Sequence, residues 1–185
     1  MVTGAGGSIG SELCLQIARL APKRLVLLDT SDVALYILDQ SLHELAQRNS
    51  LNVEIVALIG SVHHRDRMRE VLETYAVETV YHAAAYKHVP LVEHNMIEGI
   101  HNNVFGTLNT AEAAISAGVK AFVLVSTDKA VNPTNVMGAT KRFAEIVLQG
   151  LQTRSNHTRF CMVRFGNVLE SSGSVVPLFR EQIRR

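Results

Sequence analysis

The stretch Gly4-Ala5-Gly6-Gly7-Ser8-Ile9-Gly10 decides the fold of this chain. It follows the short apolar run 1–3 and precedes an amphipathic pattern that predicts a helix over residues 8–20. Glycine allows backbone conformations with positive φ and leaves no Cβ in the way of a ligand. A glycine-rich turn between a strand and a helix is typical of loops that bind phosphate at the helix N-terminus.

The same alternation of short apolar runs and longer amphipathic stretches continues along the chain. It predicts strands at residues 24–29, 52–60, 79–84, 121–126 and 159–168, and helices at 31–48, 65–75, 95–118 and 134–151. Asn132 or Thr134 is predicted to cap the last of these helices. Strands that alternate with helices indicate the α/β class, here a doubly wound parallel sheet with helices on both faces.

A carboxylate ends the second predicted strand. Asp29 lies where an acidic side chain can accept hydrogen bonds from an adenosine ribose and repel a 2′-phosphate. The glycine loop and Asp29 together therefore predict a Rossmann-like domain over residues 1–185 that binds NAD rather than NADP. The predicted loop contacts are Gly4, Gly7, Ser8, Ile9 and Gly10.

Bulk composition excludes several other classes of protein. The 185 residues are 47% hydrophobic and 19% charged with a net charge of +1, which argues against a nucleic-acid or anionic-membrane surface. No apolar run reaches the roughly 18 residues that span a bilayer, and no signal peptide precedes one, so a cytoplasmic protein is expected. Cys14 and Cys161 lie in apolar segments and are expected to be buried thiols. The spacing of the histidines predicts no metal site.

Three further segments follow predicted strands, at the sheet edge where doubly wound folds bind ligands. They are HAAAYKHVP at 82–90, STDKAVNP at 126–133 and RFGNV at 164–168. The small residues Ala83, Ala84 and Ala85 would let a cofactor lie against the backbone. Met137 and Lys141 are four apart, so one face of the last helix should carry both.

Several motifs resemble those of a known family: SIGSE, HAAAYKHVPLVE, NNVFGT, STDKAVNPTNVMGATKR and RFGNVLESSGSVVPLF. Together they resemble the extended short-chain dehydrogenase/reductases and, within them, the CapD-type polysaccharide-biosynthesis family with its large UDP-N-acetylglucosamine 4,6-dehydratases. The superfamily carries Tyr-x-x-x-Lys, whereas the large dehydratases have methionine in place of the tyrosine. This chain matches them with Met137 and Lys141.

The resemblance implies a redox-neutral dehydration that turns a UDP-N-acetylhexosamine, UDP-N-acetylglucosamine in the first place, into its 4-keto-6-deoxy derivative. It implies that Asp128 is the acid at C6, that Lys129 is the base at C5 and that Thr127 bonds the C4 oxygen. The group that takes the C4 hydroxyl proton is left open, with Asp128, directly or through Thr127 or water, as the candidate. Met137 would lie against the substrate or the nicotinamide, and Lys141 would hold the nicotinamide ribose.

The remaining predicted contacts complete the site. Cofactor contacts are expected from Ser61, Val62, Asn103, Ser126, Phe165 and Asn167, and substrate contacts from Lys87, His88, Asn167 and Ser174. Glu170 departs from the family, which usually has glycine there, and would bring a negative charge near a diphosphate.

The resemblance also bears on what surrounds the chain. It implies a longer protein with a membrane-anchoring N-terminal region and a C-terminal substrate lobe, both expected to lie outside this chain, with the catalytic domain on the cytoplasmic side of the membrane. It implies a homo-oligomer that pairs through the helices near Asn103 and Met137. Two alternatives stay open: a nucleotide-sugar 4-epimerase, and an inert NAD-binding fragment.

Overall fold

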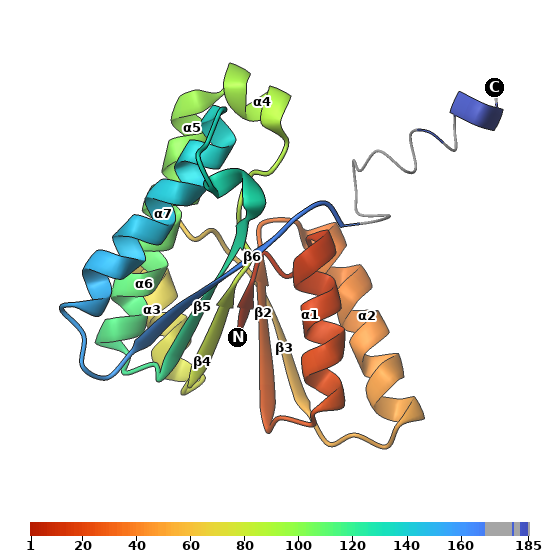
Figure 1. The fold of residues 1–185 in the computed structure, drawn as a ribbon. Helices are drawn as coiled ribbons and strands as arrows, with labels where there is room; N and C mark the ends of the chain where they lie inside the picture. Colours follow the sequence, from red (N-terminus) through yellow and green to blue (C-terminus); the bar gives the residue numbers. More distant parts are fainter. Residues whose placement is uncertain (169–178, 180–181, 185) are drawn as a thin grey trace.

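The computed structural model describes residues 1–168, 179 and 182–184 and contains one six-stranded sheet (Figure 1). The strand order is β3-β2-β1-β4-β5-β6, and every neighbouring pair is parallel. This is the order of a doubly wound dinucleotide-binding fold, so the predicted fold class is confirmed. The strands are β1 (Val2–Thr3), β2 (Arg24–Asp29), β3 (Glu54–Ile59), β4 (Thr79–His82), β5 (Ala121–Thr127) and β6 (Arg159–Phe165).

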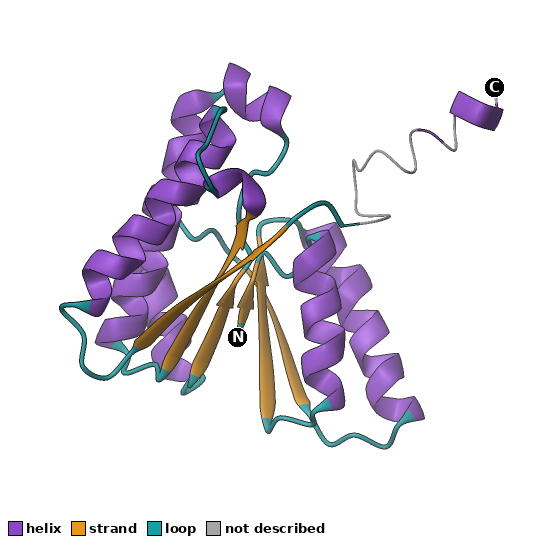
Figure 2. Cartoon of the chain, in the orientation of Figure 1, coloured by secondary structure: helices purple, strands orange, loops and turns teal. Residues whose placement is uncertain are grey.

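Helices cover both faces of the sheet (Figure 2). Helices α1 and α2 lie on one face, and α3, α6 and α7 lie on the other (Figure 1). The helical elements are α1 (Ser8–Arg19), α2 (Asp32–Arg48), α3 (Arg65–Thr74), α4 (Val89–His94), α5 (Met96–Ile100), the π-helix η1 (His101–Phe105), α6 (Gly106–Ser116), the 3₁₀-helix η2 (Asp128–Ala130) and α7 (Val136–Gln152).

Strand β2 shows how the sheet separates two cores. Leu25 and Leu27 pack into the core beneath α1 and α2, while Val26 and Leu28 pack into the core beneath α3 and α6. All four side chains are buried, because alternate residues of a strand point to opposite faces and both faces are covered. The continuous apolar run of this strand is therefore explained by helices on both sides.

The strand order reverses between β1 and β4, which are hydrogen-bonded neighbours. The chain first builds outward through β2 and β3, then returns to start the second half at β4. At this point the amide of Ala83 donates to the carbonyl of Thr3 at 3.0 Å, so the glycine loop and the segment after β4 lie together. Such a reversal opens a crevice at the carboxyl ends of the strands.

The start of α7 corrects one prediction. Asn135 caps the helix by accepting a hydrogen bond from the Gly138 amide at 2.8 Å, whereas Asn132 and Thr134 do not cap it. Asn132 has φ +46°, which is a turn conformation and not the extended conformation that N-cap residues adopt.

The predicted helix over 95–118 is helical but not uniform. A π-helix at η1 separates α5 from α6, and the short α4, with proline in its first turn, precedes them. Helix α4 was not predicted, because six residues are too few to show a helical period. The π-helix was not predicted either, because composition does not distinguish it from an α-helix.

Strand β4 buries a histidine. His82 is fully buried and bonds Thr3 and Thr107 through its two ring nitrogens, at 2.8 and 3.1 Å. Burial lowers its pKa to about 3, so the imidazole is neutral at ordinary pH.

Cys14 is buried as expected, but Cys161 is exposed, which corrects the prediction. Cys161 lies on β6, the last strand in the sheet order, where one face has little cover.

The described part of the chain contains no helix long and apolar enough to cross a membrane. Ser174 and Glu170 lie outside the described residues.

Candidate active site

A cavity of about 950 Å³ opens at the carboxyl ends of the strands, at the reversal of strand order. Its walls come from the glycine loop, the segment after β4, the ends of β5 and β6, and one face of α7. The predicted site residues that line it are Gly4, Gly7, Ser8, Ile9, Gly10, Ala83, Ala85, Lys87, His88, Ser126, Thr127, Lys129, Met137, Lys141, Phe165 and Asn167. Segments far apart in sequence therefore meet at one cavity.

The glycine loop leaves no room for a Cβ at three positions, Gly4, Gly6 and Gly10. Gly4 has φ +64°, and a Cβ there would lie 2.5 Å from the amide nitrogen of Ala84. A Cβ on Gly10 would lie 2.0 Å from the carbonyl oxygen of Gly4. Gly7 is the N-cap of α1 and provides no side chain to cap it. The start of α1 thus presents backbone amides and the positive end of its dipole to the cavity, which suits a pyrophosphate.

Asp29 fastens this loop to the end of β2. Its Oδ2 accepts from the Gly6 amide at 2.9 Å, and its Oδ1 accepts from the Ser31 amide at 3.0 Å. Among the described residues Asp29 borders the glycine loop but is not part of the cavity wall. The carboxylate is partly exposed, so it can both hold the loop and face a ribose.

Thr127, Asp128, Lys129 and Asn167 form one hydrogen-bonded cluster. Thr127 donates to Asp128 Oδ1 at 2.9 Å, and the Lys129 ammonium donates to Asp128 Oδ1 at 3.2 Å and to Asn167 Oδ1 at 3.1 Å. The Thr127 and Lys129 hydrogen bonds hold the pKa of Asp128 below its usual range. Asp128 is exposed beside the cavity and not part of its wall. The cluster therefore holds Asp128 as an ionised carboxylate beside the cavity.

Met137 and Lys141 share the buried face of α7, as their spacing predicts. Both are 4% exposed, and both line the cavity. Burial lowers the pKa of Lys141 to about 8, and the negative charge of Glu145 opposes that fall. The cavity thus contains an amine whose charge depends on its surroundings.

Four predicted cofactor contacts are not part of the cavity wall. Ala84 packs in the core beneath Gly4, and Val62 is buried against Gly106. Ser61 accepts from the His63 amide at 3.2 Å. Asn103 is fully buried and bonds both backbone groups of Tyr86 and the Thr140 hydroxyl, at 2.8 to 3.0 Å. Asn103 therefore holds the segment after β4 against α7.

Sequence reasoning missed part of the wall. Tyr86, Leu91, Val92, Asn95, Glu98, Val125, Gly166 and Val168 also line the cavity. Several of these belong to α4, α5 and the turns beside them, and the unpredicted α4 is the reason that they were overlooked. Within the described ranges, no group of three or more His, Cys, Asp and Glu side chains could hold a metal ion.

The chain matches a known protein family over its whole length. Residues 1–185 match the family described as "Polysaccharide biosynthesis protein". The chain belongs to this family. The resemblance drawn from the motifs is confirmed at that level.

Three curated relatives show how similar and how long the family members are. The chain is 50% identical over 183 residues to "Capsular polysaccharide biosynthesis protein CapD" of Staphylococcus aureus, covering 99% of the chain and 30% of the relative. It is 49% identical to "Probable polysaccharide biosynthesis protein EpsC" of Bacillus subtilis (strain 168), covering 100% and 30%. It is 36% identical to a UDP-glucose 4-epimerase of Rickettsia canadensis, covering 100% and 53%. The chain spans only about a third to a half of these relatives.

Solved structures share the fold. The X-ray structure of Pen from Bacillus thuringiensis is 34% identical, with TM-score 0.87, and covers 100% of this chain and 54% of its own. DesIV of Streptomyces venezuelae, a dTDP-glucose 4,6-dehydratase crystallised with NAD, is 21% identical with TM-score 0.78, covering 99% and 61%. At that identity the second match shows the fold alone.

Proposed function

We propose that this chain carries the catalytic domain of an NAD-dependent nucleotide-sugar 4,6-dehydratase that acts on a UDP-N-acetylhexosamine, with UDP-N-acetylglucosamine as the first substrate to test. The observation that carries the proposal is the hydrogen-bonded cluster of Thr127, Asp128 and Lys129. Thr127 and Lys129 line the same cavity as Met137 and Lys141, and Asp128 lies beside it. An acid, a base and a cation at one cavity, with no tyrosine at the Met137 position, fit an elimination of water.

The glycine loop fits the cofactor. A Cβ at Gly4 or Gly10 would meet backbone atoms at 2.5 or 2.0 Å, so the loop packs tightly where phosphates would meet the start of α1. Gly4, Gly7, Ser8, Ile9 and Gly10 would hold the pyrophosphate, Asp29 the adenosine ribose and Lys141 the nicotinamide ribose. NAD supplies the reversible hydride exchange with the sugar. The Ala83 and Ala85 side chains are small enough to let a ring lie along the wall.

Proton transfer is assigned to Asp128. In the free protein Asp128 is ionised, because Thr127 and Lys129 both donate to it. A carboxylate in that state suits removal of the C4 hydroxyl proton, with Thr127 as the hydrogen-bonded relay. The protonated Asp128 that results is then the acid that the C6 hydroxyl needs in order to leave as water. One residue can therefore serve first as base and then as acid.

Lys129 is assigned to the C5 proton. Its ammonium lies between Asp128 and Asn167, and all three groups belong to segments at the carboxyl ends of β5 and β6. Loss of the ammonium proton to solvent would leave a neutral Lys129 amine able to take the C5 proton, while Asp128 stays free to take the proton of the C4 hydroxyl. Asn167, with Lys87 and His88 across the cavity, would orient the sugar nucleotide.

A product assay tests the proposal. The chain is incubated with NAD and UDP-N-acetylglucosamine, and the sugar nucleotide is analysed by mass spectrometry. Loss of one water, with no net NADH, is the expected result. Cofactor binding without product would instead support the inert NAD-binding fragment, and the longer protein would then be assayed in the same way.

The second candidate is a nucleotide-sugar 4-epimerase, which the Rickettsia canadensis relative favours. An epimerase also oxidises C4 but eliminates nothing, so its product has the mass of its substrate. The acid and base beside the cavity, Asp128 and Lys129, favour the dehydratase. A product of unchanged mass and inverted C4 would decide for the epimerase.

Replacing Asp29 should weaken the preference for NAD over NADP. Asp29→Asn removes the charge that repels a 2′-phosphate, and its amide oxygen can still accept one of the two loop hydrogen bonds. We expect the ratio of NAD to NADP affinity to fall about tenfold, or about 1.4 kcal/mol. Calorimetric titration with both cofactors measures it. The control is Asp32→Asn, at a nearby carboxylate on α2 that accepts a hydrogen bond from the Val33 amide of its own turn. An unchanged ratio would remove the assignment of Asp29.

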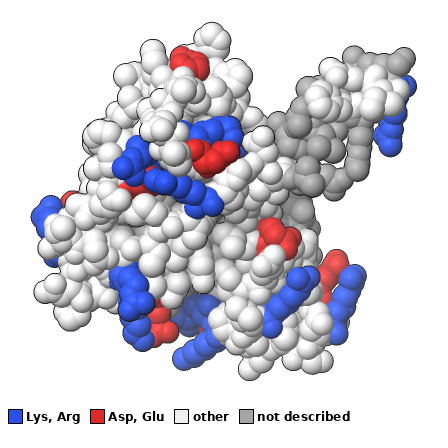
Figure 3. All heavy atoms as spheres, viewed as in Figure 1, with Lys and Arg blue, Asp and Glu red and all other residues white. Residues whose placement is uncertain are grey.

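We also propose that the protein is a homo-oligomer that pairs through α5, η1 and α7. These elements pack side by side and expose Ile97, Phe105, Phe143 and Ile146. The upper part of the face seen in Figure 3, over α4 and α5, carries few charged side chains. Exposed apolar residues gathered on neighbouring helices are typical of an interface.

Phe143→Glu should dissociate such an oligomer, because a charge would be buried at the interface. Sedimentation velocity is expected to change from dimer to monomer, with the circular dichroism spectrum unchanged. Val33→Glu on α2, at an equally exposed apolar residue on the other face of the sheet, should leave the dimer intact. A wild-type protein that sediments as a monomer at all concentrations would contradict the proposal.

We also propose that the catalytic domain lies on the cytoplasmic side of a membrane-anchored protein, in line with the family resemblance.

A further inference from the structure

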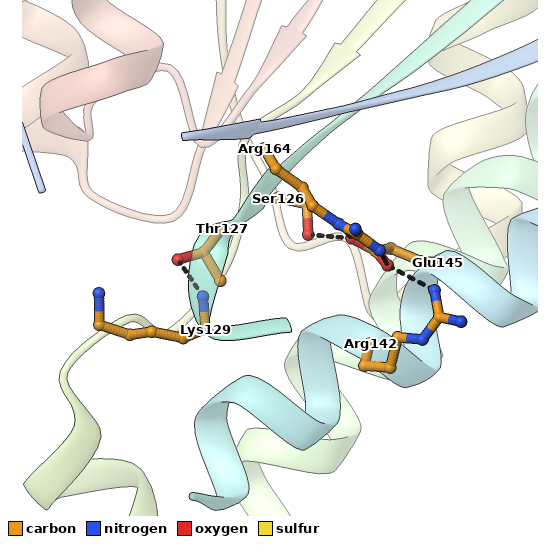
Figure 4. Close-up of polar contacts among 6 residues, drawn as sticks. All are labelled: Ser126, Thr127, Lys129, Arg142, Glu145 and Arg164. Atoms are coloured by element: carbon orange, nitrogen blue, oxygen red, sulfur yellow. Dashed lines mark hydrogen bonds and ion pairs between the residues drawn. The ribbon is translucent and has the colours of Figure 1, made fainter. Parts of the chain in front are cut away.

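A buried carboxylate lies one turn of α7 beyond Lys141. Glu145 has no exposed surface and accepts hydrogen bonds from three side chains. Ser126 Oγ donates at 2.7 Å, Arg142 at 2.9 Å, and Arg164 donates through two nitrogens at 2.8 and 2.5 Å (Figure 4). A carboxylate this deep is costly to bury unless it is fully paired, and here all its donors are in place.

The three donors come from the segments that build the site. Ser126 precedes Thr127 at the end of β5, and Arg164 is one residue before Phe165 at the end of β6. In Figure 4 the side chains of Ser126, Arg142 and Arg164 point toward Glu145, whereas Lys129 extends away from them. A bidentate arginine–carboxylate pair fixes distance and angle. The carboxylate therefore joins α7 to the two strand ends that carry the proposed catalytic groups.

Charge gives the cluster a second effect. The cluster holds two guanidinium groups against one carboxylate, and Lys141 lies one helical turn away in a buried position. Burial favours a neutral Lys141, and Glu145 opposes it. Without Glu145, the Lys141 amine would lie near the guanidinium groups of Arg142 and Arg164 with no carboxylate to offset their positive charge.

We propose that Glu145 is a positioning residue that keeps Lys141 protonated and fastens α7 to the ends of β5 and β6. That Lys141 then holds the nicotinamide ribose rests on the function proposed above. The protonation of Lys141 does not rest on that function, since it depends on the negative charge of Glu145 acting against burial within the chain itself.

Other titratable groups also face Lys141 or the elements packed against α7. Most of them are cationic or neutral, and the carboxylates among them are Asp128, Glu93 and Glu98. Asp128 is bonded to Thr127 and Lys129, and Glu93 accepts from the Val136 amide. The carboxylate that raises the pKa of Lys141 against the effect of burial is Glu145. The other titratable groups are His82 on β4, Lys87 and His88 after β4, Glu93 and His94 on α4, Glu98 on α5, His101 on η1, Asp128 and Lys129 on η2, and Arg164 on β6.

The test is a pH titration of the lysine side-chain amines by NMR in ¹⁵N-lysine-labelled protein, with Lys141→Met to assign the resonance. Glu145→Gln should lower the titration midpoint of Lys141 by at least about one pH unit. Arg142→Gln should raise it, because it removes a cation from the cluster while Ser126 and Arg164 still hold Glu145. Glu112→Gln breaks an ion pair with Arg65 at 3.0 Å between α6 and α3, and should leave the midpoint unchanged. Dinucleotide affinity, measured across the same pH range, should follow the midpoint.

Opposite shifts in the two variants are a result that a purely structural role would not produce. Midpoints within about 0.3 pH unit of wild type in both variants would overturn the proposal, even if both unfold at lower temperature. If Glu145→Gln does not fold, the titration midpoint of Lys141 in Arg142→Gln is the deciding measurement. A midpoint that is unchanged or lower than in wild type rejects the assignment of Glu145. Failure of the product assay would leave these titrations intact, so the two proposals fail separately.

Discussion

Asp128→Asn is expected to abolish the loss of water from the sugar nucleotide while NAD binding stays intact. Asparagine can still accept the hydrogen bonds from Thr127 and Lys129, but it cannot take a proton from C4 or return one to C6. General acid–base groups contribute about 10²–10⁴-fold, so we expect turnover to fall by at least about 10²-fold. The measurement is the product assay described above, with the longer protein wherever the 185-residue chain does not turn over.

The structure supplies a matched control for this change. Asp66→Asn removes another exposed carboxylate, which pairs with Arg69 on α3 at 3.6 Å, and should leave turnover unchanged. Because Asp128 is exposed beside the cavity, its replacement should not alter thermal stability or the calorimetric affinity for NAD. Turnover within about threefold of wild type would reject Asp128 as the proton-transfer group.

Gly10→Ala should have the largest effect on cofactor binding. The added Cβ would lie 2.0 Å from the Gly4 carbonyl oxygen and 2.9 Å from Ala5 Cα, and both are backbone atoms. Gly4 cannot move aside, because its own Cβ position is 2.5 Å from the Ala84 amide nitrogen. The loop and α1 must therefore separate, at a cost of about 1–3 kcal/mol in the free energy of unfolding. NAD affinity should fall by at least about tenfold.

Gly7→Ala is the matched comparison. Its Cβ would meet one atom, the Gly4 carbonyl oxygen, at 3.3 Å, and its backbone conformation is one that alanine adopts readily. We expect a loss of about 1 kcal/mol or less from the poorer N-cap, and a correspondingly small change in NAD affinity. Chemical denaturation and calorimetric titration of both variants provide the comparison. Equal NAD affinities for the two variants would show that the tight contact at Gly10 does not shape the glycine loop.

Much of the fold follows from local sequence signals. The glycine loop, the apolar β2 ending in Asp29, and the i, i+4 spacing of Met137 and Lys141 each predicted a feature that the structure contains. These signals succeed because they depend on backbone conformation and side-chain period within about ten residues. The sequence did not predict helix α4, because six residues are too few to show a helical period. The prediction of Asn132 as the N-cap of α7 was wrong, because its φ of +46° is decided by the turn around it.

The sequence alone therefore determined the class of fold, the position of the glycine loop and the face of α7 that points to the cavity. Tertiary structure alone brought Lys129 to Asn167, 38 residues away, and Glu145 to Ser126 and Arg164. It also buried Asn103 between Tyr86 and Thr140, where it bonds both residues. The physical reason is that these contacts depend on the register between β5 and β6 and on how α7 packs across their ends, and no local pattern in the chain encodes either.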